Sequence, residues 1–221
     1  MPTGTDYPKF TIFNALRWKV LPAKFGGGED YLWKFKFGWI IHNKQSIKDA
    51  ALNNSIPPFL LGGVALIEVG GSDFMDWPAF ITRSFDWSGP DWMDKYFTIL
   101  KNHADTSMGA VSIQLRRSAE TKHMNPATLN QKDLNDLANE LQSDVTNLKI
   151  VAAHLHGLLM IDYPSSLPNL ELTDEQIKIV GTRYLYGPEK SLDFIRQKAM
   201  DSKSYGSKIL ERKQLVIKLL Q

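Results

Sequence analysis

Apolar side chains recur at helical spacing along most of the chain and predict a mainly helical protein. Ser46 is placed to cap a helix that carries Ile47, Ala50, Ala51 and Leu52 and ends near residues 53–54. Similar periodicity predicts further helices over residues 110–121, 130–141, 144–160, 173–184, 191–200 and 207–220. We therefore expect a mainly α fold of the α+β kind, with a helical bundle around one buried central helix.

The first part of the chain has a different pattern. Residues 31–37 alternate apolar and polar side chains, which is typical of a half-buried strand, and Gly26, Gly27 and Gly28 form a turn signal before them. The pattern predicts a β-containing or irregular N-terminal cap over residues 1–44. Residues 45–221 then form the main compact domain, either of a complete protein or of a longer chain.

Glu68 is the most unusual residue in the sequence, because it ends an otherwise apolar run. Pro57 and Pro58 suit the first turn of a buried helix that runs to Glu68. Desolvation disfavours the charged carboxylate and raises its pKa, which suits a proton donor near neutral pH. Gly70 and Gly71 then take the backbone out of the helix, as at the lip of a cleft. The alternative is a Glu on the solvent side of an amphipathic helix.

Residues 70–106 lack periodicity and are rich in aspartate and tryptophan. A long segment of this kind inside a compact domain is usually functional. Its acids are candidates for a second carboxylate beside Glu68: Asp73, Asp76, Asp86 and Asp91. Asp86 lies between aromatic residues near a turn and is favoured, although an Asx turn explains it as well.

Composition narrows the classes of partner. The net charge of +2 does not indicate a nucleic-acid-binding protein, and the chain has no cysteine for disulfides or thiolate metal sites. The N-terminus lacks the pattern of a secretory signal, and no apolar stretch is long enough to span a membrane. His154 and His156 lie on different helix faces, so no metal site is expected.

Four segments carry a family pattern by their order. They are the apolar helix ending in Ile67-Glu68; Ser107, Gly109 and Gln114; a helix from Asn147 to Leu155; and Tyr184-Leu185-Tyr186-Gly187-Pro188. In this order they resemble the lysozyme-like superfamily, close to goose-type lysozymes and lytic transglycosylases. The chain departs from the family at Val69, where a serine is usual, at Leu185, where an asparagine is usual, and in its longer Gly-to-Gln spacing.

The resemblance implies cleavage of the peptidoglycan glycan strand between N-acetylmuramic acid and N-acetylglucosamine. Glu68 is then the general acid and Asp86 the second catalytic carboxylate. The residues expected to bind substrate are Ser107, Gln114, Tyr184, Tyr186 and Asp73. A lytic transglycosylase using the same acid, and a non-catalytic glycan-binding module of the same fold, stay open as alternatives.

The nearest likeness within the superfamily is to peptidoglycan-cleaving domains that bacteria use as antibacterial effectors. It implies a monomer that needs no cofactor or metal and does not insert into membranes. It also implies delivery to the periplasm of a target bacterium, or secretion, without a classical signal peptide. Peptidoglycan is the expected partner, with an immunity protein as a second one.

Overall fold

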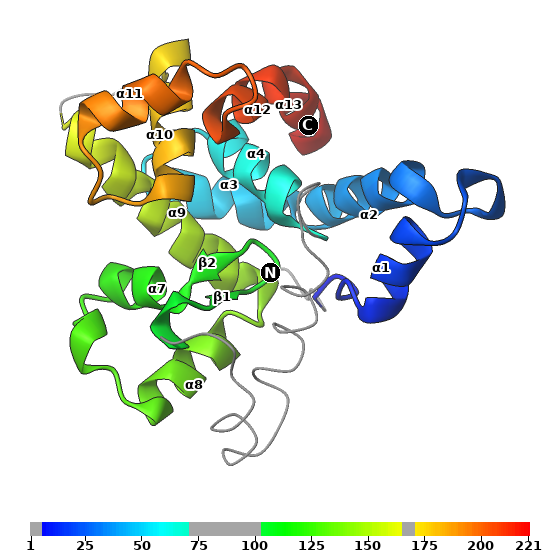
Figure 1. Cartoon of the computed structure of the whole chain (residues 1–221), viewed down its shortest axis with the longest axis horizontal. Coiled ribbons are helices and arrows are strands. Elements are labelled where there is room, and N and C mark those ends of the chain that lie inside the picture. The colour runs from blue at the N-terminus through cyan, green and yellow to red at the C-terminus, as the bar shows by residue number, and fades with distance from the viewer. Residues whose placement is uncertain (1–5, 71–102, 165–170) are drawn as a thin grey trace. The chain divides into compact units, whose positions relative to one another are not determined.

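The computed structural model describes residues 6–70, 103–164 and 171–221. Within these ranges the protein is mainly helical, with eleven α-helices and one small two-stranded antiparallel sheet (Figure 1). The prediction of a mainly helical chain is confirmed. Of the predicted site residues, Asp73 and Asp86 lie outside the described residues, as do Asp76 and Asp91.

The described chain divides into two compact units. The first contains residues 1–39 and 68–147, and the second contains residues 40–67 and 148–221. The divisions fall within helices α2 (Gly28–His42) and α9 (Asp144–Asp162) and at the last residue of α4 (Pro58–Glu68). The predicted boundary between residues 44 and 45 stays a prediction.

The N-terminal part of the first unit is helical, so the strand predicted over residues 31–37 is wrong. It contains α1 (Ile12–Lys19), a short 3₁₀ helix η1 (Ala23–Phe25) and α2, which covers residues 31–37 (Figure 1). Leu32, Lys36 and Trp39 are buried, at spacings of four and three. This is the helical period, and the apparent alternation arose because Lys36 is one of the residues facing inward.

The rest of the first unit contains a hairpin and two helices. Strands β1 (Ser107–Met108) and β2 (Ile113–Gln114) pair with Ser107 opposite Gln114. The hairpin is followed by α7 (Leu115–Thr121) and α8 (Gln131–Glu140), with short 3₁₀ segments η2 (His103–Asp105) and η3 (Pro126–Thr128). The predicted helix over residues 110–121 is therefore correct only from Leu115. The helix predicted over 130–141 is confirmed, with Asn130 as its N-cap.

The second unit contains the remaining helices. They are α3 (Lys44–Asn53), most of α4 and α9, α10 (Asp174–Tyr186), α11 (Leu192–Ala199), α12 (Tyr205–Glu211) and α13 (Lys213–Leu220). The predicted helices over residues 144–160, 173–184 and 191–200 are confirmed to within about two residues, the usual uncertainty of helix ends. The helix predicted over 207–220 is two helices, separated at Arg212.

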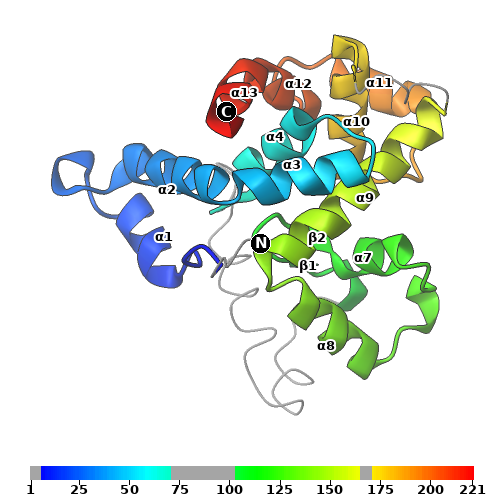
Figure 2. The same cartoon turned by 180° about the vertical axis from the view of Figure 1, so that it is seen from behind.

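Glycines let helices approach closely in this second unit. A Cβ built on Gly62 would lie 2.7 Å from Val216 of α13, and one on Gly63 would lie 2.8 Å from Ile209 of α12. Gly181 of α10 meets Gly206 of α12, where a Cβ on Gly181 would lie 2.7 Å from the Gly206 Cα. Figures 1 and 2 show α4, α12 and α13 side by side from opposite directions. Every residue of α4 from 60 to 67 is buried.

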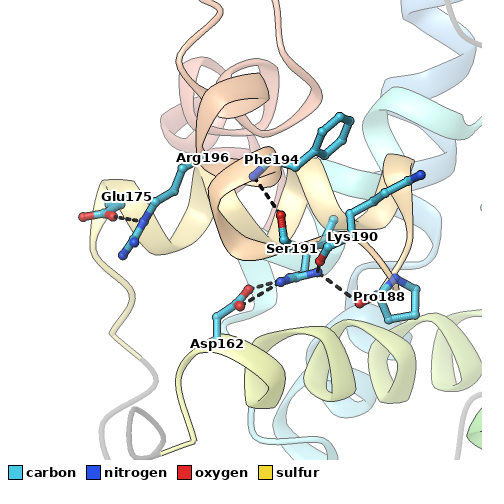
Figure 3. A network of polar contacts seen from close by, with 8 residues as sticks. Asp162, Glu175, Pro188, Lys190, Ser191, Phe194 and Arg196 are labelled. Atoms are coloured by element: carbon cyan, nitrogen blue, oxygen red, sulfur yellow. Dashed lines mark hydrogen bonds and ion pairs between the residues drawn. The ribbon is translucent and has the colours of Figure 1, made fainter.

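A buried ion pair joins the end of α9 to α10. The Arg183 and Asp162 side chains are only 2% and 4% exposed. The guanidinium donates to both Asp162 carboxylate oxygens and to the carbonyls of Pro188 and Lys190, at 3.2 and 2.9 Å (Figure 3). Bidentate Arg–carboxylate pairing is the strong form of this contact. The predicted turn after Tyr186 is therefore held in place by the arginine that precedes it.

Candidate functional site

A cavity of about 240 Å³ lies within the first unit and contains two of the predicted site residues, Glu68 and Ser107. Five stretches of the chain line it: residues 7–10, Phe35 and Trp39 of α2, residues 68–70, residues 107–110 with Ser112, and Gln142 with Asp144. The cavity therefore brings together the end of α4 and the β1–β2 hairpin, which are far apart in the sequence.

Glu68 reaches this cavity from the last position of α4. Residues 60–67 are buried and Glu68 itself is half-buried. No residue of α4 is exposed, so Glu68 does not lie on the solvent face of an amphipathic helix, which was the alternative interpretation.

The backbone leaves the helix directly after Glu68, as the glycines predicted. Gly70 has a φ of +73°, and a Cβ there would lie 3.1 Å from Leu32 and 3.2 Å from Phe10. A side chain at this position meets both a strained backbone and occupied space. Gly70 therefore allows the chain to turn against the cavity wall.

The hairpin that carries Ser107 is held by Asn147 of α9. The fully buried Asn147 side chain accepts a hydrogen bond from the Val111 backbone N–H at 2.8 Å and donates to the Val111 carbonyl at 3.1 Å. Gly109 has a φ of +86°, and a Cβ there would overlap the Asn147 amide. Gly109 and Asn147, both parts of the family pattern, thus set the hairpin conformation that presents Ser107 to the cavity.

The N-terminal segment forms another wall of the cavity. The Tyr7 N–H donates to the Asp144 carboxylate at 3.2 Å, and the Asp144 N–H donates to the Asp6 carboxylate at 3.1 Å. Lys9 donates to the Gln142 side chain at 2.8 Å. The rings of Tyr7 and Phe10 pack edge-on against Phe35, with centroids 5.3 and 4.9 Å apart. These contacts hold residues 6–10 along the start of α9.

Asp144 is a second carboxylate at this cavity, and the sequence reasoning missed it as a site residue. It is buried and lies in the first turn of α9, where an acid favours the helix dipole. This local role is enough to explain an acid at the helix start. The sequence therefore does not indicate that Asp144 shares a cavity with Glu68. Only the tertiary fold brings the two acids to the same cavity.

The other predicted residues have local roles. Gln114 lies opposite Ser107 in the hairpin, and its side-chain oxygen accepts from Arg116 Nε at 2.9 Å. In the second unit the Tyr184 ring contacts those of His154 and Tyr205, while the exposed Tyr186 packs edge-on against Phe194. Sugar binding by these three side chains stays a prediction.

No group of three or more His, Cys, Asp or Glu residues in the described ranges is arranged to hold a metal ion. Among the helices of the described ranges, none is long and apolar enough to cross a membrane.

Comparison of the chain with protein-family models, with curated proteins and with solved structures found no match. The likeness to lysozyme-like enzymes therefore depends on the ordered sequence motifs, and the candidate site depends on the cavity.

Proposed function

We propose that this protein cleaves the glycan strand of peptidoglycan with Glu68 as the general acid. The observation that carries the proposal is the position of Glu68, at the end of a helix without exposed residues and on the wall of a cavity. A carboxylic acid at that position can donate its proton to the leaving oxygen of a glycosidic bond.

Asp144 and Asp86 are the candidates for the second catalytic group. Asp144 lines the same cavity as Glu68, which favours it among the described acids. Its carboxylate would stabilise or attack the positively charged sugar centre, or activate water. Asp86 remains the candidate from the sequence pattern. A separation of about 5 Å between the two carboxyl groups favours retention, and about 6.5–9.5 Å favours inversion.

The cavity, at about 240 Å³, is smaller than common ligand pockets of about 300–1,000 Å³. We infer that it holds one sugar ring of the strand. Ser107 on the hairpin supplies a hydroxyl for hydrogen bonding to that ring. The fold proposed to support this chemistry is lysozyme-like, with α4 as its buried central helix.

We also propose that the protein acts as an antibacterial effector on the periplasmic cell wall of another bacterium, as the family likeness implies. An immunity protein that covers the cavity would then protect the producing cell. Both proposals depend on the enzymatic one.

The test is the release of muropeptides from purified peptidoglycan. Glu68→Gln keeps the size of the side chain and removes the acid, so release should fall by about 10²–10⁴-fold. The matched control is Glu211→Gln, which changes an exposed Glu on α12 and should leave activity unchanged. Both variants should keep the helical circular dichroism spectrum of the wild type. Absence of muropeptide release by the wild type would overturn the proposal and favour the non-catalytic module.

Product analysis separates the remaining alternatives. Mass spectrometry of the muropeptides shows reducing ends for a hydrolase and anhydro ends for a lytic transglycosylase. Asp144→Asn and Asp86→Asn, compared side by side, identify the second carboxylate as the one whose loss lowers kcat without raising KM.

A further inference from the structure

Helix α1 turns apolar side chains toward solvent. Among the side chains of α1 that the structure describes, Ala15 and Trp18 are buried. Phe13, Leu16 and Val20 follow one another at spacings of three and four, so they form a stripe on another face of the helix. Phe13 is 78% exposed and Val20 is 68% exposed. Large side chains of this kind usually face the core, and a contiguous exposed set marks an interaction surface.

The exposed apolar set continues beyond the helix. Leu21 follows directly, and Phe25 in η1 is 63% exposed. Arg17 donates to the Gly26 carbonyl at 2.8 Å, which ties the helix to the end of the η1 turn. We call Phe13, Leu16, Val20, Leu21 and Phe25 the α1–η1 surface.

The segment that carries this surface is rich in cations. Residues 7–28 contain Lys9, Arg17, Lys19 and Lys24 and no Asp or Glu, so this segment carries +4 in a chain whose net charge is +2. The Lys19 ammonium lies 3.6 Å from the centre of the Trp18 ring, and that of Lys24 lies 5.0 Å from the Phe25 ring. The second contact keeps Lys24 beside a member of the α1–η1 surface, and the first holds the exposed Lys19 against α1.

Acids flank this segment, with Asp6 before it and Glu29 and Asp30 after it. Glu29, at the start of α2, accepts a hydrogen bond from the indole N–H of the buried Trp18 at 2.9 Å. That interaction engages the carboxylate of the exposed Glu29 at the edge of the Trp18 indole. The exposed face thus combines apolar side chains with cations.

From this combination we infer that the α1–η1 surface binds peripherally to an anionic lipid bilayer. Short amphipathic helices with Phe and Leu on one face and Lys or Arg beside them lie in the plane of the membrane interface. The apolar side chains enter the boundary of the acyl chains, and the lysines meet the phosphate headgroups. Helix α1 has eight residues, so it lies on the membrane and cannot span it. This inference does not depend on the proposed glycosidase activity.

The experiment is co-sedimentation of the full chain with vesicles. One set contains equal parts phosphatidylglycerol and phosphatidylcholine, and the other contains phosphatidylcholine alone. The wild type should bind the anionic vesicles at least tenfold more strongly, and added salt should weaken that binding because it screens the charges. Equal binding to both sets, or binding to neither, would overturn the inference.

Two double variants separate the apolar and charged contributions. Phe13→Ser with Phe25→Ser should lower binding about tenfold or more, since two large apolar side chains no longer enter the interface. Lys19→Glu with Lys24→Glu should lower it at least about twentyfold, because each cation near an anionic surface contributes about fivefold. The control is Met200→Ser with Lys203→Glu, which changes an 85% exposed methionine and an exposed lysine elsewhere and should leave binding unchanged.

Sedimentation velocity without vesicles tests whether a second copy of the chain, rather than lipid, covers the α1–η1 surface. If the wild type forms dimers that Phe13→Ser with Phe25→Ser disperses, a second copy covers the surface and the lipid inference is wrong. Circular dichroism of every variant checks that the chain is folded. The changed side chains are exposed, so the fold should tolerate them.

Discussion

The two units of this protein are stabilised by different kinds of contact. In the second unit, helices meet at glycines and one buried ion pair fixes the α10–α11 turn. In the first unit, directional hydrogen bonds join distant segments around a cavity, as between Asn147 and Val111 or between Tyr7 and Asp144. The segments that line a cavity must keep their positions without filling it, and buried hydrogen bonds to their backbones fix those positions.

The largest effect on stability should come from breaking the ion pair of the second unit. Asp162→Asn leaves the buried Arg183 charge without its carboxylate and should cost about 3–5 kcal/mol. Chemical denaturation measured by circular dichroism gives the value. Replacing both residues, as Asp162→Leu with Arg183→Met, should restore part of the loss because no buried charge remains. A loss below about 1 kcal/mol for Asp162→Asn would mean that the pair is accessible to water.

The next effect tests whether glycine contacts are essential to the second unit. In Gly206→Ala the new Cβ overlaps the Lys178 carbonyl oxygen, so α10 and α12 must separate, at a cost of about 2–3 kcal/mol. Gly157→Ala is the control, because nothing lies within 4 Å of a Cβ there and the position is exposed in α9. It should stabilise the protein by about 0.5–1 kcal/mol. If both changes shift the thermal midpoint in the same direction, the close contact between α10 and α12 does not explain the need for glycine at position 206.

A third change addresses the first unit. Asn147→Ala removes both hydrogen bonds to Val111 and leaves its buried N–H and carbonyl without those partners, which should cost about 2 kcal/mol. Amide hydrogen exchange at Val111 should accelerate more than exchange in α10, because the hairpin is affected first. Asn139→Ala, an exposed change on α8, should have almost no effect. Equal acceleration in both units would show that the hairpin has no separate support.

The smallest effect concerns Tyr163 at the end of α9. Burial, followed by the charge of Glu175, raises the pKa of the Tyr163 phenol above its ordinary value of 10.0. Its hydroxyl is buried and has no hydrogen-bond partner among the described residues. Tyr163→Phe should therefore be neutral or stabilising by less than about 1 kcal/mol at pH 7.

The sign of the pH effect follows from the raised pKa. The unfolded chain loses the phenolic proton first, so the contribution of Tyr163 to stability is present below about pH 10 and is lost as pH rises through the folded value. Tyr163→Phe removes this loss, and its advantage over the wild type should grow above pH 10. The free energy of unfolding in urea is measured at pH 7 and above pH 10. Tyr186→Phe, a change at an exposed tyrosine, serves as the control.

Local patterns predicted much of the helical fold, because capping and periodicity act within one element. Asn130, Thr173 and Ser191 accept capping hydrogen bonds at the starts of three of the predicted helices. The predicted cap Ser46 is wrong, because it lies inside α3, whose N-cap is Asn43. Residues 31–37 were predicted wrongly because seven residues fit alternation and helical periodicity equally well, and the buried Lys36 hid the helical face. Residues 110–114 were predicted wrongly because their conformation depends on Asn147, which lies 36 positions from Val111.

The candidate site was predictable where one residue was chemically out of place, as Glu68 is. Asp144, the other acid on the cavity wall, was not, because an acid at a helix start has a sufficient local explanation. Only the fold places the start of α9 on the cavity that Glu68 also lines. Sequence patterns thus identify a single unusual side chain more readily than two side chains, distant in the sequence, that line the same cavity.

The acceptors of Arg183 have a consequence for recognising distant relatives of this protein. Two of them are main-chain carbonyls, at Pro188 and Lys190, and any amino acid supplies a carbonyl. The third is the side chain of Asp162, which only an acid can replace. Substitutions should therefore accumulate freely at position 190, whereas positions 162 and 183 should change together. The acid ends one helix, and the arginine follows 21 residues later near the end of the next helix. This spaced pair makes a better search pattern than the turn that follows it.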